Sequence, residues 1–540
     1  MDASENTIAE GWPRALGIAG LLLVVAAGAW LRWAPPETVS DLLPWPDALE
    51  YEEGARSLLA GDGYQLAING KSYPSRYPPG LSLLIAPVFS LVGTAPGGGI
   101  WVVFLMALAT IVTTWRLGLM LAGVWGGLAA GLLVSLSPLH VAWSQAVMSD
   151  VPATAIMSLL CLLAIRAADA GPRSTRWILL GIACGLGPVF RPALMAVVPG
   201  ILLLVWMGHA GTKDSLAKFM RFLGVLGAAV VGSLALNAIL TRTLLLTRYD
   251  YWVEATIFDP KYIFAAPQAG GEMPNFFFLI SELAGGGRLY PWPIAVLAVL
   301  GISLQFRDGG RKRQFAALGV VTIGATVALY SIYFWQSGRF LLPILPIVAV
   351  LAGYPLGARI PLQLRVPAIG LFAWGLTLLF QGYPGAFGPP QPALGIGQTL
   401  LAIDAEVEDN ARIIGHAPHL LVSRTIGPAE DREWIHLGAD PHRINLKKMG
   451  REGQPHEPGR QIRITRAEWP PKTAPLIRMI QQALDKNQPV YFYDPPGQAF
   501  GIRWPRRIRK VIAAHFQLEL YLEVAGSRVY RVQNLPDHDS

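Results

Sequence analysis

Long apolar runs dominate the chain from residue 15 to about residue 385. Runs that suit a hydrocarbon core about 30 Å thick, at roughly 20 residues each, begin near residues 15, 98, 118, 150, 176, 192, 220, 290, 314, 340 and 366. The pattern predicts about eleven transmembrane helices. The first run is longer than a signal-peptide core and no small-residue cleavage site follows it, so we interpret it as an uncleaved span.

Composition and loop charge support a polytopic membrane protein. The 540 residues are 52% hydrophobic and 15% charged, with a formal net charge of +8. A cytoplasmic N-terminus at residues 1–14 places every strongly basic short loop on one side of the membrane, as the positive-inside rule requires. These loops lie at Arg116 and at residues 166–176, 213–221, 307–313 and 359–365. We therefore attribute the excess of basic residues to the cytoplasmic loops of a membrane protein rather than to a nucleic-acid-binding surface.

The opposite, extracytoplasmic face receives a first loop at residues 34–97, a long loop at residues 242–289 and the chain beyond the last span. In the first loop, EYEEGARSLLA has helical spacing and predicts a short helix on the membrane surface. We expect Leu58 and Leu59 to face inward. The acids Glu50, Glu52 and Glu53 are expected to face solvent. Pro78 and Pro79 then begin a second apolar helix that is too short to span comfortably.

From residue 391 to residue 540 the composition changes to one rich in Arg, His, Pro and charge. The short runs ARIIG, PVYFYD, LELYLEV and RVYRVQ predict strands, and APLIRMIQQALDK predicts a helix. We expect a small extracytoplasmic α/β domain, separate from a transmembrane module at residues 15–385. Cys161 and Cys184 lie in apolar runs, which indicates buried thiols rather than a disulfide framework.

Polar residues gather where spans meet the extracytoplasmic face. Asp47 follows the first span, Asp150 opens the fourth, Arg191 lies between the fifth and sixth, and Arg339 opens the tenth. Lys71 and Arg76 lie in the first loop, in NGKSYPSRYPPG. Any one of these charges is compatible with an interface anchor. Together, carboxylates and arginines on one face indicate a pocket for a phosphorylated substrate that also needs a base.

Four strings resemble a known family of membrane enzymes. They are PDALEYEEGARSLLAGDGY, SRYPPGLSLLIAP, SPLHVAWSQAVMSDVP and GRFLLPILPIVAVLAG. Their order and sidedness resemble C-type membrane glycosyltransferases, in the branch of the protein O-mannosyltransferases and the lipid A aminoarabinose transferase. The resemblance covers about residues 12–385. It implies an extracytoplasmic pocket that takes a sugar from a polyprenyl phosphate and passes it to a hydroxyl of a lipid, glycan or protein, with inversion.

The resemblance also implies roles for particular residues. Asp47 is expected to be the base, and Asp150 to orient the acceptor or the sugar. Four basic residues are candidates to hold the donor phosphate: Arg76, Arg339, Arg191 and Lys71. Two further acids, Glu52 and Glu53, compete with Asp47 for the role of base. The aromatic-rich loop RYDYWVEATIFDPKY matches no family pattern, and Tyr249, Glu254 and Lys261 are named there only as substrate contacts to test.

We predict no metal or other cofactor. Oligosaccharyltransferases of the same fold class use a metal, but this sequence has no tight ligand pair such as H-E-x-x-H, and the branch it resembles is not known for a required metal. His416 and His419 form an H-x-x-H in an expected loop without an evident third ligand. The expected partners are the lipid-linked donor, an envelope acceptor and membrane lipids, in the inner membrane of a bacterium.

Two other classes of function are compatible with a polytopic chain. A transporter or flippase would have its substrate site near the bilayer midplane, often with inverted repeats. The sequence shows no repeat, and its ionisable candidates cluster at one face instead. A non-catalytic scaffold or lipid-binding subunit would retain the pattern of spans without needing the base, so an Asp47→Asn variant that kept full sugar transfer would favour it.

Overall fold

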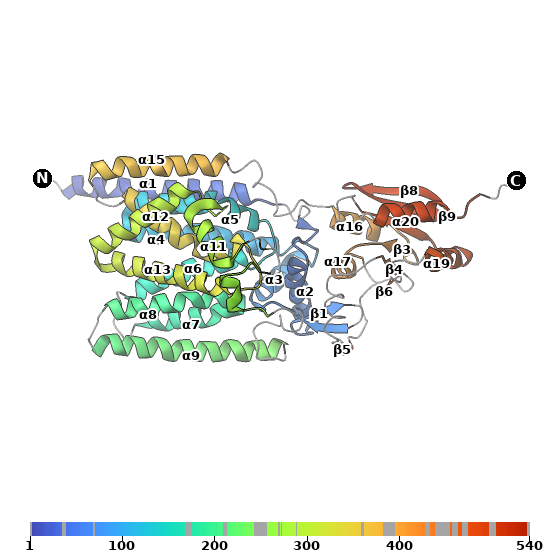
Figure 1. Cartoon of the computed structure of the whole chain (residues 1–540), viewed down its shortest axis with the longest axis horizontal. Helices are drawn as coiled ribbons and strands as arrows, with labels where there is room; N and C mark the ends of the chain where they lie inside the picture. The colour runs from blue at the N-terminus through green and yellow to red at the C-terminus, as the bar shows by residue number, and fades with distance from the viewer. Residues whose placement is uncertain are drawn as a thin grey trace.

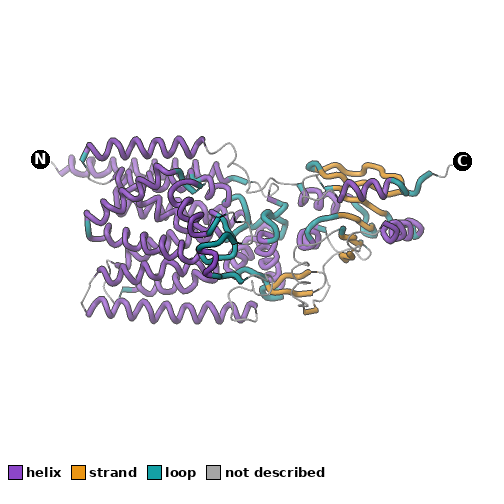
Figure 2. Tube along the Cα trace, viewed as in Figure 1, coloured by secondary structure: helices purple, strands orange, loops and turns teal. Residues whose placement is uncertain are grey.

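The structure is a computed structural model. It describes the chain apart from residues 1–2, 35–38, 69–70, 169, 171–173, 209–212, 242–255, 268–270, 272, 288, 358–360, 382–394, 427–431, 438–453, 456–462, 467–472, 496–503 and 537–540. The molecule is elongated, with a helical half that holds the N-terminus and a second half that holds the strands and the C-terminus (Figures 1 and 2). The first loop lies between the two halves.

The helical half is built from roughly parallel and antiparallel apolar helices. They are α1 (Ala3–Arg32), α4 (Ile100–Leu136), α6 (Asp150–Ala168), α7 (Thr175–Phe190), α8 (Val197–Gly208), α9 (Lys213–Thr241), α12 (Trp292–Asp308), α13 (Gly310–Ser331), α14 (Leu345–Gly357) and α15 (Leu362–Gln381). Among the described residues, six helical stretches are long and apolar enough to cross a membrane, and other apolar helices are shorter. A multi-pass membrane fold is thereby confirmed, while the number of spans stays a prediction.

The spans predicted to begin near residues 98 and 118 are the two arms of one hairpin within α4. The backbone reverses at Gly123, which has φ 73° and ψ −167°. The two arms pack closely at Gly118, where an added Cβ would lie only 2.8 Å from the carbonyl oxygen of Gly126. A positive φ favours glycine, so Gly123 lets the two arms turn within one residue.

The first loop folds into two helices and a β-hairpin. Helix α2 (Asp47–Ala60) ends at Gly61. The left-handed conformation of Gly61 (φ 83°) lets its backbone amide donate a hydrogen bond to the carbonyl oxygen of Leu58. Strands β1 (Gln65–Ile68) and β2 (Lys71–Pro74) follow, and α3 (Gly80–Val92) begins directly after Pro79. Both predicted helices of this loop are therefore present, and the Pro-Pro pair begins the second one.

The predicted orientation of α2 is wrong. Glu50, Glu52 and Glu53 are buried, whereas Leu59 is 42% exposed and Leu58 is only half-buried. The acids are buried because α2 lies under α3, β1 and the C-terminal half rather than in open solvent. Glu52 accepts hydrogen bonds from the backbone amides of Gly97 and Gly99, at 3.3 and 2.9 Å, next to the start of α4. A negative charge is favourable at that helix end.

The C-terminal half is a mixed α/β unit around a six-stranded sheet of order β6-β4-β3-β7-β9-β8. Its first four strands are parallel, and β9 and β8 are antiparallel. The elements are α16 (Ile396–Glu406), β3 (Arg412–Gly415), α17 (His419–Thr425), β4 (Glu433–His436), β5 (Gln454–Pro455), β6 (Arg463–Arg466), α19 (Thr473–Asp485), β7 (Val490–Asp494), α20 (Trp504–Ala513), β8 (Gln517–Val524) and β9 (Ser527–Gln533). The four predicted strands and the predicted helix correspond to β3, β7, β8, β9 and α19.

The two faces of this sheet have different partners. Ile414 and Phe492 pack in one apolar cluster with α19 and α20. Ile413, Trp434 and Tyr491 point to the other face, into a cluster that also contains α2, α3, α16 and α17. Strand β5 additionally pairs with β2. The C-terminal half and the first loop thus share one hydrophobic core.

Asp41 joins these two parts of the chain by hydrogen bonds. Its buried carboxylate accepts the backbone amides of Gly395 at 2.9 Å and Gly397 at 2.8 Å, at the start of α16. Asp41→Ala leaves buried amides unbonded, so we expect it to reduce the free energy of unfolding by about 1–3 kcal/mol. Thermal unfolding in detergent measures this. The exposed Asp62→Ala is the control, and equal melting temperatures for the two variants would refute the expectation.

Candidate active site

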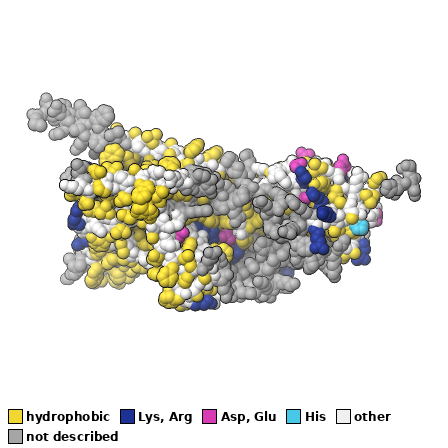
Figure 3. Space-filling view, turned by 45° about the horizontal axis from the view of Figure 1, so that its top comes forward, with side chains coloured by type: hydrophobic (Ala, Val, Ile, Leu, Met, Phe, Trp, Pro, Cys, Tyr) yellow, Lys and Arg dark blue, Asp and Glu magenta, His cyan; other side chains and the backbone are white. Residues whose placement is uncertain are grey.

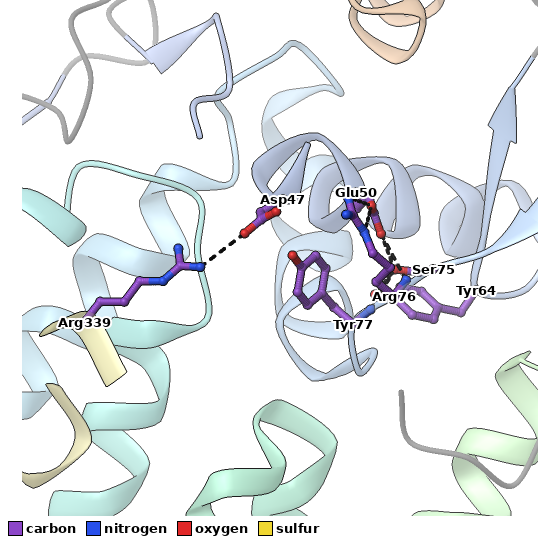
Figure 4. A network of polar contacts seen from close by, with 7 residues as sticks. All are labelled: Asp47, Glu50, Tyr64, Ser75, Arg76, Tyr77 and Arg339. Carbon is purple, nitrogen blue, oxygen red and sulfur yellow. Dashed lines mark hydrogen bonds and ion pairs between the residues drawn. The ribbon is translucent and has the colours of Figure 1, made fainter. Parts of the chain in front are cut away.

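Asp47 and Arg339 form the centre of the candidate site (Figure 4). Arg339 Nη2 lies 3.5 Å from Asp47 Oδ2, and the two side chains are 16% and 15% exposed. Asp47 is the first residue of α2, where the helix dipole favours a carboxylate. Arg339 lies in the 3₁₀-helix η5 (Gly338–Ile344), just after Ser337, whose hydroxyl accepts the Arg339 amide at 3.4 Å. The pair is sheltered but still open to a ligand.

Asp150 and Arg191 form a second, more buried ion pair. Arg191 Nη1 donates to Asp150 Oδ1 at 2.6 Å, and Arg191 Nε donates to the hydroxyl of Tyr330 at 3.1 Å. Asp150 is the first residue of α6, Arg191 directly follows α7, and Tyr330 lies in α13. Within the described part of the chain, the second carboxylate oxygen of Asp150 makes no hydrogen bond. Three helices therefore hold this pair at one end of the bundle.

An aromatic surface joins the two ion pairs. The guanidinium of Arg339 lies 5.6 Å from the ring centre of Phe340, and that of Arg191 lies 5.7 Å from the same ring. Arg339 also lies 4.8 Å from the ring centre of Trp143, in α5 (Pro138–Trp143). Tyr330 stacks on Phe340 with ring centres 4.6 Å apart. Cation–π contacts of this kind fix the guanidinium groups without neutralising them, so the two pairs form one site.

Arg76 is engaged by a different acid, Glu50. Arg76 Nε donates to Glu50 Oε1 at 2.6 Å, and Arg76 Nη2 contacts the same carboxylate. The Arg76 amide and the Ser75 hydroxyl donate to Glu50 Oε2 at 3.0 and 3.2 Å, and the Tyr64 hydroxyl donates to Ser75 at 3.2 Å (Figure 4). Burial is the largest single effect and lowers the pKa of Arg76, but the charge of Glu50, the smaller effects of Tyr77 and Asp47 and the hydrogen bond to Glu50 together raise that pKa above its usual value. Arg76 therefore stays charged.

The Glu50–Arg76 pair predicts a large stability effect. Glu50→Ala leaves a buried, uncompensated guanidinium, so we expect it to reduce the free energy of unfolding by about 3–5 kcal/mol. Thermal unfolding of the purified variant measures the loss. A double variant, Glu50→Leu with Arg76→Met, should regain much of it, because apolar replacement of a buried pair is often neutral. A single variant that melts like the wild type would contradict this account.

The other candidates lie apart from this site or outside the described residues. Lys71 lies in β2, opposite Ile68 and Pro455. Lys261, in η3 (Pro260–Ile263), is 53% exposed and pairs with Asp259 at 2.9 Å. Tyr249 and Glu254 lie outside the described residues.

The H-x-x-H of the C-terminal half has a third histidine nearby, which the sequence did not reveal. The ring of His436, at the end of β4, lies 4.1 Å from that of His419 and 5.1 Å from that of His416. Even so, the described residues contain no group of three or more His, Cys, Asp or Glu side chains arranged to hold a metal ion.

Sequence reasoning missed the aromatic and acidic residues that frame the site. Trp143, Tyr330 and Glu50 look like ordinary core or surface positions in the sequence, because each is identified only by a partner far along the chain. Tyr51 is a fourth case, since it donates to Ser149 at 2.9 Å, beside Asp150. The signal that was available is the clustering of aromatic residues in HVAW, SRYPPG and LYSIYFW.

Comparison with known proteins gives a family match in sequence. Residues 76–236 match the family model described as dolichyl-phosphate-mannose-protein mannosyltransferase. A curated relative from Edwardsiella ictaluri, undecaprenyl phosphate-alpha-4-amino-4-deoxy-L-arabinose arabinosyl transferase, is 28% identical over 228 residues. The match covers 42% of this chain and 37% of that relative, so it spans only about a third of the relative's length.

Solved structures give a match over nearly the whole chain. ArnT from Cupriavidus metallidurans in the apo state superposes with a TM-score of 0.58 at 16% identity, covering 97% of this chain and 98% of that one. The same protein bound to undecaprenyl phosphate gives 0.55 at 14% identity, over the same shares of the two chains. The oligosaccharyltransferase AglB from Archaeoglobus fulgidus, in complex with an inhibitory peptide and a dolichol-phosphate, gives 0.52 at 10% identity, covering 97% and 75%.

At these identities the structural matches establish the fold alone, and the fold agrees with the family match in sequence. The resemblance inferred from the four sequence strings is therefore confirmed. The chain is a multi-pass membrane protein with the C-type glycosyltransferase fold.

Proposed function

We propose that this protein is an inverting glycosyltransferase that moves a sugar from a polyprenyl-phosphate donor to a hydroxyl group of a lipid, glycan or protein. The observation that carries the proposal is the Asp47–Arg339 pair beside the Asp150–Arg191 pair at one end of the helical half. Support comes from the curated relative, whose name refers to a sugar on undecaprenyl phosphate, and from ArnT and AglB, which have been solved with polyprenyl phosphates.

The proposed reaction needs one base and one group of cations. The acceptor hydroxyl oxygen bonds to the anomeric carbon of the sugar while its proton passes to Asp47. The bond between the anomeric carbon and the phosphate oxygen breaks, and polyprenyl phosphate leaves as an anion. Arg339 stabilises the negative charge on that oxygen. Its planar, permanently charged fork suits a phosphate, so no acid is needed to protonate the leaving group.

The second ion pair has a supporting role in this proposal. Asp150 has one carboxylate oxygen bound to Arg191 and a second without a hydrogen bond in the described residues, and that oxygen orients a sugar or acceptor hydroxyl. Arg191 holds the Asp150 carboxylate in place through its bond to Oδ1 and adds positive charge near the donor phosphate. We propose a structural role for Arg76 instead of phosphate binding, because its guanidinium and backbone amide bond to Glu50 and fix the segment before α3 against α2.

We propose a bacterial inner-membrane location with the site and the C-terminal half on the extracytoplasmic face. The basic short loops support this orientation, since they gather on the other side under the positive-inside rule. A donor carried by a polyprenyl chain remains in the bilayer, and a site at the ends of the helices lies where such a phosphate would be. The orientation is tested by introducing cysteines into the loops and finding which of them can be labelled from outside intact cells.

The proposed reaction is independent of divalent metal. Both carboxylates of the site already face guanidinium groups, and these cations oppose the binding of another cation. Purified protein should therefore keep its full transfer rate in excess EDTA. Loss of transfer in EDTA, with recovery when Mg²⁺ or Mn²⁺ is added back, would show that a metal takes part.

The test of the proposed function is a panel of radiolabelled polyprenyl-phosphate sugars incubated with purified wild-type and Asp47→Asn protein. We expect transfer or hydrolysis with at least one donor by the wild type, and far less by the variant. Absence of both with every donor would overturn the enzyme proposal. Uptake of a solute by proteoliposomes in that case would favour a transporter.

A further inference from the structure

An exposed apolar surface lies beside the candidate site, on the segment between α9 and α12. Its exposed members, called the aromatic cap here, are Phe258, Phe264, Met273, Phe276, Phe277 and Ile280. Phe264 is 80% exposed and Phe277 is 57% exposed. The cap is formed by the ends of η3, by the segment that precedes α11 (Asn275–Ser281) and by α11 itself. Patches of several large apolar side chains mark an interaction surface.

Well-defined contacts hold the cap in place, so its exposure is a property of the folded protein. Phe258 forms an isolated β-bridge with Tyr333, and their ring centres lie 5.5 Å apart. The Asn275 side chain donates to the Tyr333 carbonyl at 2.6 Å, and Gln336 donates to the Met273 carbonyl at 2.9 Å. The residues that bind the cap, 332–336, lead directly into η5 and Arg339. The cap is thus attached to the element that carries Arg339.

The cap lies near the ends of helices that are apolar enough to contact a membrane. Trp292, the first residue of α12, is 43% exposed and packs edge-on against Trp374 of α15, as expected of an interfacial aromatic belt. In Figure 1, α9 runs along the long axis of the molecule and reaches further toward the C-terminal half than α11 does. Its residue Ile239, near the end of that helix, is 77% exposed. So exposed an apolar side chain, on a helix long and apolar enough to cross a membrane, favours lipid rather than water around this end of α9.

Helices on either side of the cap segment also expose large apolar side chains, such as Val231 and Ile239 in α9 and Val299 in α12. Figure 3 shows hydrophobic side chains over much of the helical half and over a lobe beside it, with Lys or Arg side chains at the lower edge of the lobe. The same segment carries one charged pair, Lys261 with Asp259, whose side chains are 53% and 25% exposed. Large apolar side chains next to exposed charges are typical of segments that lie in the plane of a membrane interface.

We propose that the aromatic cap is embedded in the lipid headgroup and upper acyl region of the leaflet at this end of the helices. The partner is the bilayer itself, because the cap adjoins helices that are apolar enough to contact a membrane and that also expose large apolar side chains. The embedded cap holds residues 332–336, and with them Arg339, at a fixed depth in the membrane. The surface would contact lipid whatever reaction the neighbouring site performs.

Spin labels on single introduced cysteines test this proposal in the full-length protein. The native Cys161 and Cys184 are buried, which leaves Phe264→Cys and Phe277→Cys as the accessible thiols of the two variants. Lys510→Cys, on the exposed side of α20, is the control in water. Proteins in nanodiscs of phosphatidylethanolamine and phosphatidylglycerol are compared by collisions of the label with oxygen, which concentrates in lipid, and with a water-soluble nickel chelate.

The expected result is an oxygen-to-nickel accessibility ratio several-fold higher at positions 264 and 277 than at position 510. Ratios equal to that of the control would place the cap in water and overturn the proposal. Low collision rates with both reagents would also overturn it, because they would show that protein covers the cap. Neither measurement depends on catalysis, so failure here is distinct from failure of the proposed function.

Discussion

Asp47→Asn is expected to lower sugar transfer by about 10²- to 10⁴-fold, the range that a positioned general base contributes. Asn preserves the size of the side chain and its position at the start of α2, but it cannot accept the hydroxyl proton. The loss should therefore appear in kcat, with the fold and melting temperature of the protein little changed. Initial rates with a saturating lipid-linked donor measure it.

Asp62→Asn is the matched control, because Asp62 belongs to the same loop but is exposed beyond the end of α2. It should transfer sugar like the wild type. The Glu52→Gln variant tests whether Glu52, rather than Asp47, is the base. Glu52 is buried and bonded to the amides of Gly97 and Gly99, so its loss should act on stability. A catalytic loss in Glu52→Gln greater than in Asp47→Asn would move the role of base to Glu52.

Arg339→Gln is expected to have the second large effect, a loss of about 10²- to 10³-fold, as for removal of one donor that stabilises a developing oxyanion. The guanidinium lies 3.5 Å from Asp47 and 4.8 Å from the ring centre of Trp143, so the substitution removes a positive charge from beside the proposed base. Arg339→Lys should restore part of the rate, because lysine keeps the charge but lacks the planar fork. Rates measured over a range of donor concentrations show whether binding or turnover is affected.

The control for this charge change is Arg313→Gln. Arg313 is exposed at the start of α13, at the opposite end of that helix from Tyr330, and it contributes to a basic loop rather than to the site. Its removal should leave transfer unchanged. A variant of Arg339 that transfers sugar at the wild-type rate would show that another cation binds the phosphate.

Much of the architecture could be predicted from the sequence because it follows from local patterns. Apolar runs of the right length predicted the multi-pass helices, and short runs such as PVYFYD predicted strands that the structure has as β7 and its neighbours. The four charged residues of the site were found because they recur at the same end of several spans. The order of the segments along the chain determines which span ends share a face, and this order can be read from the sequence.

The remaining features depend on contacts between distant segments. The burial of Glu50 and Glu52 could not be predicted, because α2 is covered by the C-terminal half, which begins more than 300 residues later. The partner of Arg76 could not be predicted either. Arg76 could have paired with Asp47, yet its backbone amide and its guanidinium both donate to Glu50. Strands β4 and β6 were missed because their sequences, EWIH and RITR, mix charged and apolar residues and are specified by their neighbours in the sheet.

The central claim is that Arg339 binds the donor phosphate and Asp47 accepts the proton. Its most direct test is to measure the binding of polyprenyl phosphate, without a sugar, to the purified wild type, Asp47→Asn and Arg339→Gln. Arg339→Gln should bind about tenfold or more weakly, because a charged hydrogen bond to the phosphate is lost. Asp47→Asn should bind at least as tightly as the wild type, because Arg339 no longer has a carboxylate beside it. Equal affinity of Arg339→Gln and wild type, or weaker binding by Asp47→Asn, would contradict the assignment of donor phosphate to Arg339 and of the proton to Asp47.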